Sequence, residues 1–98
     1  MIIIRVNVTV QPEKRSAFVA QIKQEMVDVK QQFVGCERFG LYEDVMDENG
    51  FLLYEEWQTL ANFKAYQASD YFQENGKKLF PMMAGKPDSD YFEAVVVE

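Results

Sequence analysis

Apolar positions in the first third of the chain change from a period of two residues to a period of three or four. Hydrophobic and polar residues alternate over 2–10, which predicts a strand with one β-branched face. Helical spacing follows between Pro12 and Gly35, which are suited to the first turn and the end of a helix. We therefore expect an amphipathic helix of about five turns. Its apolar positions are Phe18, Ile22, Met26, Val29 and Phe33.

The middle of the chain predicts a β-hairpin. One strand is expected from Phe39 to about Val45 or Met46, and a second over 51–57. The segment 47–50 between them ends in Asn-Gly, a dipeptide that tolerates positive φ, so we place the hairpin loop there.

A helical region and one more strand complete the pattern. Thr59 is suited to cap the helix, which we expect to break near 69–70 and to end before Pro81. The last strand is expected over 91–97. The order β-α-β-β-α-β predicts a ferredoxin-like α+β fold with an antiparallel sheet, in a single domain covering 1–98.

Both faces of the last expected strand are apolar. One face carries Tyr91, Val95 and Val97, and the other carries Phe92, Ala94 and Val96. The helices of this fold cover only one face of the sheet, and the uncovered face would leave a large apolar patch in water. We therefore expect a homodimer in which a second copy covers that face about a two-fold axis.

Composition and charge narrow the range of partners and compartments. The chain has sixteen acidic and ten basic residues, and the net charge of −6 argues against binding to nucleic acid or an anionic membrane. No apolar run is long enough for a membrane span, and 2–4 is too short for a signal-peptide core. Cys36 is the only cysteine and has no disulfide partner, so we expect a cytoplasmic protein with a reduced thiol.

The missing residue types narrow the chemistry. The chain has no histidine, which removes the commonest general base and the commonest metal ligand. One cysteine cannot form a thiolate cluster, and the five glycines are scattered rather than gathered in a phosphate loop. We therefore expect neither a metal nor a cofactor.

The stretch from Leu52 to Trp57 is the most distinctive motif. An apolar run ends in the acidic pair Glu55-Glu56 and the only tryptophan, and an aromatic-rich helix is expected directly after it. This arrangement resembles the antibiotic biosynthesis monooxygenase family, and the resemblance covers nearly the whole chain. It implies a dimeric α+β barrel in which two sheets pack face to face.

The resemblance also implies a set of site residues. In family oxygenases that tailor polyketides, the tryptophan that matches Trp57 lines the substrate cavity. Three other site positions of those enzymes, an asparagine, a tyrosine and an arginine, correspond to Leu53, Phe63 and Lys77. The tryptophan is retained, and Lys77 keeps the charge of the arginine.

Haem-degrading members of the family supply two further positions. Their helix tryptophan corresponds to Tyr66, and their strand-one asparagine has a counterpart in Asn7, although aligning on the strand end places Val6 there. Their iron-binding histidine falls at about Gly76. Because the chain has no histidine, haem would need a tyrosine or Cys36 as its ligand, and we do not expect haem.

Aromatic residues supply the remaining candidates for a ligand site. A flat apolar wall would be formed by Trp57, Phe63, Phe72 and Phe80, although the simpler interpretation of Trp57 is an anchor for the corner between strand and helix. Lys77 or a tyrosine such as Tyr66 would face an anion as the hydrogen-bond donor. Leu53 and Asn7 complete the expected substrate contacts.

Glu55 and Glu56 are adjacent in a strand and therefore point to opposite faces. They cannot hold one substrate atom between them as a catalytic pair. Two interpretations of each remain open: an exposed or paired acid, or a buried acid with a raised pKa.

The leading hypothesis is a cofactor-independent monooxygenase that acts on a small phenolic or quinol substrate in an apolar cavity between sheet and helices. Such a substrate reacts with oxygen as its anion, provided that the site is dry and holds a base. With histidine absent, the base is Glu, Tyr, Lys or water. The alternatives are an isomerase of a small oxygenated metabolite and a non-catalytic dimeric ligand-binding module of the same fold.

Overall fold

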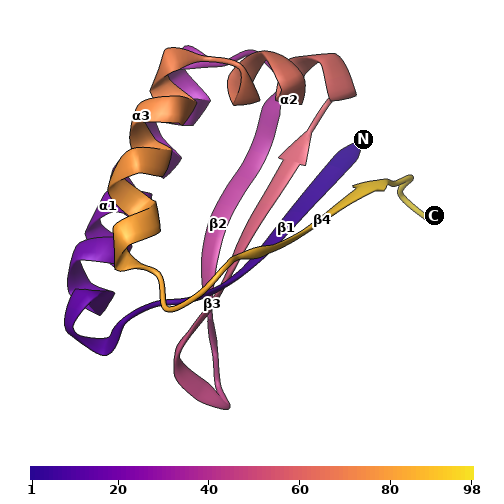
Figure 1. Cartoon of the computed structure of the whole chain (residues 1–98). Helices are drawn as coiled ribbons and strands as arrows, with labels where there is room; N and C mark the ends of the chain where they lie inside the picture. Colours follow the sequence, from indigo (N-terminus) through magenta and orange to yellow (C-terminus); the bar gives the residue numbers. More distant parts are fainter.

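The computed structural model describes residues 1–98 and contains one antiparallel sheet with helices on one of its faces (Figure 1). The elements are β1 Ile2–Thr9, α1 Arg15–Gln32, β2 Cys36–Asp44, β3 Asp47–Trp57, α2 Leu60–Gln67, α3 Asp70–Leu79 and β4 Asp88–Glu93, with short 3₁₀ helices at Pro12–Lys14 and Phe80–Met82. The expected ferredoxin-like α+β fold is confirmed, with its second helical region divided in two.

β1 lies inside the sheet, whose strand order is β2-β3-β1-β4. It pairs antiparallel with both neighbours, and Ile4 lies opposite Glu55 on β3 and opposite Tyr91 on β4. Because side chains alternate along a strand, these three residues share the face that the helices cover. Arg5 and Asn7 point to the other face, which no helix covers and which we call the open face.

The hydrophobic core lies between the covered face and the helices. Phe18, Ile22 and Val29 of α1 are completely or almost completely buried, and Met26 and Phe33 pack against them partly buried. These are the apolar positions that the helical spacing predicts. None of the helices is both long and apolar enough to cross a membrane.

Two side-chain caps divide the second helical region. Thr59 Oγ1 accepts a hydrogen bond from the backbone N–H of Asn62 at 3.1 Å and begins α2. Ser69 Oγ accepts one from the backbone N–H of Phe72, also at 3.1 Å, and begins α3. Each cap satisfies a backbone N–H that has no partner within its own helix. The predicted cap at Thr59 and the predicted break near 69–70 are confirmed.

The hairpin turn lies earlier than predicted. It consists of 45–46, and 47–50 belongs to β3, so the expected loop at 47–50 is wrong. The carboxylate of Asp44 accepts a hydrogen bond from the N–H of the second turn residue at 2.8 Å and shapes the turn locally. The backbone N–H of Val10 donates to the carbonyl of Asn49 at 2.9 Å, which holds the start of β3 next to the end of β1.

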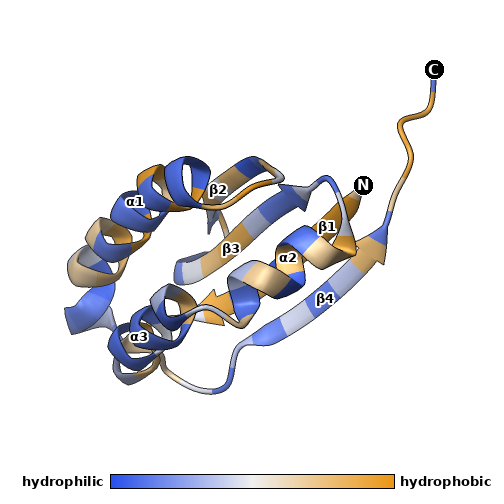
Figure 2. Ribbon diagram, turned by 90° about the horizontal axis from the view of Figure 1, so that it is seen from above, coloured by the Kyte–Doolittle hydropathy of each residue, from blue (hydrophilic) through white to orange (hydrophobic).

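The last strand also lies earlier than predicted, at Asp88–Glu93 rather than 91–97. Its partner β1 begins at Ile2, so later residues have no strand to pair with, and the backbone bond donated by Ala94 is the last. Figure 2 shows the apolar tail extending away from the sheet, and the valines at 95–97 are 77% to 90% exposed.

We expect Gly35→Ala to destabilise the fold more than Gly85→Ala, by at least about 1 kcal/mol. Both glycines have positive φ, +93° and +122°, so both substitutions carry backbone strain. Only at Gly35 would the added Cβ also collide with the side chain of Asn62, whereas nothing lies within 4 Å at Gly85. Urea titrations measure the difference, and equal losses would show that Asn62 moves aside freely.

Candidate functional site

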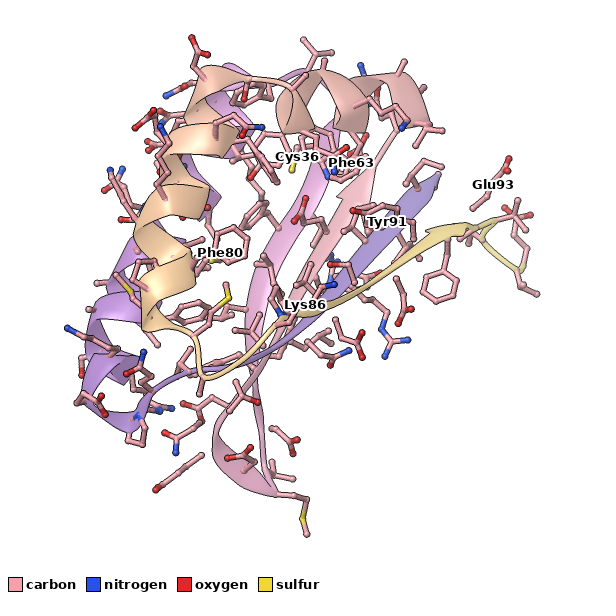
Figure 3. All side chains as sticks on the ribbon, in the orientation of Figure 1. Cys36, Phe63, Phe80, Lys86, Tyr91 and Glu93 are labelled. Carbon is pink, nitrogen blue, oxygen red and sulfur yellow. The ribbon has the colours of Figure 1, made fainter.

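A cavity of about 180 Å³ lies between the covered face of the sheet and the helices. Pockets for drug-sized ligands measure roughly 300–1,000 Å³, so this one suits a smaller molecule. Its large apolar side chains are Ile4, Val6, Leu53, Phe63, Phe72, Leu79, Phe80 and Met83. Figure 3 shows Phe80 on the α3 side of this space and Phe63 near Tyr91, with the centroids of the latter two rings 5.5 Å apart.

Two carboxylic acids are buried in the wall of this cavity. Glu55 of β3 is 4% exposed, and Glu25 of α1 is 3% exposed. The alternation of β3 places Glu55 on the covered face beside Ile4. Glu25 follows Ile22 by three residues and therefore lies on the buried face of its helix.

Burial raises the pKa of both carboxyl groups to about 7, because the charged form loses its hydration. The hydrogen bond from Trp57 opposes this rise at Glu55, and the charge of Glu25 adds to it. A hydrogen bond from Gln21 opposes the rise at Glu25. Near neutral pH both groups therefore titrate, and ionisation of one opposes ionisation of the other.

Trp57 lies behind Glu55, is completely buried and does not line the cavity. Its Nε1 donates a hydrogen bond to Glu55 Oε1 at 2.9 Å. Its ring stacks on Tyr66, with centroids 5.2 Å apart. Of the two interpretations left open by the sequence, the structure supports the corner anchor, and this anchor also orients a carboxyl group of the cavity.

A short chain of hydrogen bonds joins α1 to α3 beside the acids. Gln21 Nε2 donates to Glu25 Oε2 and to Asn75 Oδ1, both at 3.1 Å. Asn75 lines the cavity and is 6% exposed, and its Nδ2 has no hydrogen-bond partner. The donated bond at Oδ1 sets the orientation of the amide and leaves its N–H groups at the other end.

Most of the residues predicted as substrate contacts are brought together here. Leu53, Phe63, Tyr66, Phe72 and Phe80 all line the cavity. Burial raises the pKa of Tyr66 far above its ordinary value, and the nearby glutamates add to the shift. This phenol therefore stays protonated, which makes its hydroxyl available as a hydrogen-bond donor and excludes it as a base.

Lys77 and Asn7 lie outside the cavity, which corrects their expected placement. The side chain of Lys77 is 74% exposed, and its Nζ lies 3.1 Å from Glu74 Oε1. Gly76 lines the cavity, and the next residue along the helix is rotated toward solvent. Asn7 is on the open face, where it pairs with Leu52 and lines a different hollow.

The three buried polar residues of the cavity have no site role in the sequence-based prediction. For Glu55 the sequence excludes only a catalytic pair with Glu56 and leaves open a buried acid with a raised pKa, which is what the structure shows; it assigns nothing to Glu25 and Asn75. A signal for Glu25 was present, since it falls between Ile22 and Val29 on the apolar side of the predicted helix. Asn75 interrupts the apolar side of α3 in the same way.

The family profile of the antibiotic biosynthesis monooxygenases matches residues 1–77. The chain belongs to this family. It is 32% identical over 82 residues to the "Putative monooxygenase YcnE" of Bacillus subtilis, a match that covers 81% of this chain and 85% of that protein. It is also 30% identical over 86 residues to the "Uncharacterized protein sll1783" of Synechocystis sp., covering 88% of this chain but only 57% of that protein.

Solved structures of this monooxygenase family share the fold. A "putative antibiotic biosynthesis monooxygenase" from Caulobacter crescentus has a TM-score of 0.91 at 27% identity, covering 97% of this chain and 90% of that chain. One from Deinococcus radiodurans has a TM-score of 0.90 at 17% identity, covering 100% of this chain and 96% of that chain. The resemblance inferred from the 52–57 motif is confirmed.

A wider hollow of about 520 Å³ lies at the other end of the sheet of this family member. It is lined by polar and acidic side chains, among them Asn7, Glu43, Asp44 and Asp88. No three His, Cys, Asp or Glu side chains are grouped to hold a metal ion. The smaller cavity is the better candidate site, because it is apolar and contains the two acids with displaced pKa values.

We expect the free energy of unfolding to fall as the pH rises from about 4.5 to about 7. Both buried glutamates have a higher pKa when folded, so the folded chain binds more protons than the unfolded chain in this window. In Glu55→Gln, the free energy of unfolding should decrease over this pH range by about 3 kcal/mol less than in the wild type. The variant should therefore be more stable than the wild type at pH 8. Urea titrations at pH 5 and pH 8, at fixed protein concentration, test this, and an unchanged pH dependence would contradict it.

Proposed function

We propose that this protein is a cofactor-independent monooxygenase that acts on a small phenol or hydroquinone in the cavity between sheet and helices. The main support for this proposal is Glu55. Its carboxyl group has a pKa of about 7 and is buried in an apolar cavity, in a chain that has no histidine to act as the base. Membership of a monooxygenase family supports the reaction class.

The first step is proton transfer from the substrate. Glu55 Oε1 accepts the Trp57 hydrogen bond, so the substrate hydroxyl would meet Oε2. A base whose pKa lies near the working pH is partly ionised and still basic enough to take a phenolic proton. The resulting phenolate sits among aromatic side chains, and the Tyr66 hydroxyl is available to donate to its oxygen.

Oxygen insertion then needs only the substrate's own electrons. The phenolate transfers one electron to dioxygen, and the two radicals combine to form a hydroperoxide on a ring carbon. Loss of that carbon's proton and cleavage of the O–O bond release water and leave a carbonyl. Hydroquinone and O₂ thus yield hydroxyquinone and water, and the hydroquinone supplies all four electrons. The carboxyl groups return the first proton to the departing oxygen.

The acting species is proposed to be a homodimer formed through the open face. This face carries aromatic side chains and arginine, which are enriched at protein interfaces. Its central residues are Ile3, Arg5, Tyr42, Leu52, Tyr54 and Phe92. The guanidinium of Arg5 lies 5.9 Å from the ring centroid of Phe92, so these two side chains are in contact and form one continuous part of the open face.

We expect the wild type to consume oxygen with 1,4-naphthohydroquinone faster than the hydroquinone autoxidises. Glu55→Gln should lower this rate about 100-fold or more, because the amide keeps an acceptor for Trp57 but cannot take a proton. An oxygen electrode measures the uptake, with Glu13→Gln as an exposed control that keeps wild-type activity. No uptake above autoxidation would reject the proposed reaction, and an active Glu55→Gln variant would reject the base.

For the dimer, light scattering at micromolar concentration should give a mass near twice 11.4 kDa. Ile3→Glu should give a folded monomer, since it places a charge at the centre of the open face. Val27→Glu is the matched control, because Val27 is 52% exposed on α1, away from that face. A monomeric wild type, or a dimer that survives Ile3→Glu, would contradict this assembly.

A further inference from the structure

The buried polar side chains of the cavity differ in whether the protein provides them with hydrogen-bond partners. Glu55 accepts from Trp57, and Glu25 accepts from Gln21. Asn75 has its oxygen occupied by Gln21 and its Nδ2 without a partner. This Nδ2 is the only buried side-chain nitrogen or oxygen of the protein that has no hydrogen-bond partner.

An unpaired buried N–H group is costly, and native structures contain few of them. Burial raises the pKa of Tyr71 to about 12, and a hydrogen-bonding interaction from the side-chain amide of Asn75 opposes this rise, so the Tyr71 hydroxyl lies near that amide. The hydroxyl of Tyr71 donates to Asp28 Oδ2 at 2.9 Å and keeps its acceptor lone pairs, but it does not meet hydrogen-bond distance and angle toward Nδ2. The protein therefore holds a donor in the cavity wall whose nearby acceptor, the Tyr71 hydroxyl, is not well placed to receive it.

The residue after Asn75 is a second, independent sign of a ligand. Gly76 lies in the interior of α3, where glycine is unfavourable relative to alanine. A Cβ added there would come no closer than 3.6 Å to Phe80, an ordinary van der Waals contact. Packing within the protein therefore does not require glycine at this position, which lines the cavity.

We propose that Asn75 is a ligand-binding residue, whose Nδ2–H donates to an oxygen of the molecule that occupies the cavity. Nδ2 itself is buried, so a ligand oxygen reaches it only if the amide turns about its last torsion, which is soft, and the bond from Gln21 to Oδ1 loses part of its alignment. This inference rests on the cavity of the proposed function, but it requires no turnover.

The charges around the site define the class of ligand. No lysine or arginine lines the cavity, while two acids do. A phosphate or carboxylate would meet like charge with no cation in the lining and would bind poorly, since Lys78, whose charge acts on Glu25, lies outside that lining. The ligand is therefore an uncharged molecule with a hydroxyl for a glutamate and a second oxygen for Asn75. A hydroquinone meets both requirements, and a phosphorylated metabolite does not.

Anaerobic calorimetry with 1,4-naphthohydroquinone tests the role of Asn75. We expect Asn75→Leu to weaken binding about tenfold or more. The same variant should unfold at an equal or higher urea concentration, because it removes an unsatisfied buried donor. Gln73→Leu, an exposed amide of the same helix, should bind like the wild type.

Other probes separate the possible outcomes. The anion 4-hydroxy-1-naphthoate, which carries a carboxylate in place of one hydroxyl, should bind at least about tenfold more weakly than the hydroquinone. Equal binding of this anion, equal binding by Asn75→Leu, or no hydroquinone binding to the wild type would each overturn the proposal. If the hydroquinone binds, Asn75→Leu weakens that binding and no oxygen is consumed, the role of Asn75 is upheld and the oxygenase function is rejected.

Discussion

The hydrogen bond from Trp57 to Glu55 connects the fold of this protein to its candidate site. The indole closes the corner where β3 passes into α2, and it is completely buried there. Its N–H needs an acceptor, and the acceptor two residues earlier is a carboxyl group that faces the cavity. Stacking on Tyr66 ties α2 to the same point, so one contact positions a helix, a strand end and a site residue.

Two buried acids in a small domain are a cost to stability that the surrounding contacts must offset. Such groups are rarely fully buried without a partner, and each here accepts only one hydrogen bond from a neutral donor. Displaced pKa values of this kind are common at functional sites. In a chain without histidine, they place a proton acceptor near neutral pH that the bare composition does not offer.

Local patterns sufficed to predict most of the fold. The caps at Thr59 and near Ser69 and the apolar spacing of α1 lie where the sequence placed them, because these features depend on neighbouring residues. The errors involve pairing between distant segments. The start of β3 is held beside β1, and β4 ends where β1 begins, so neither boundary can be read from local residues alone.

The sequence by itself determined the order of elements, the family and the aromatic part of the cavity wall, since periodicity and the 52–57 motif are local properties. Only the tertiary structure decided which polar groups share the cavity. Glu25, Glu55 and Asn75 come from α1, β3 and α3 and meet because those elements pack together. Lys77 points to solvent because of its position around α3. Asn7 points away from the cavity because side chains alternate between the two faces of β1. Burial then changes ordinary carboxyl groups into acids with a pKa near neutrality, a property that arises only where water is excluded.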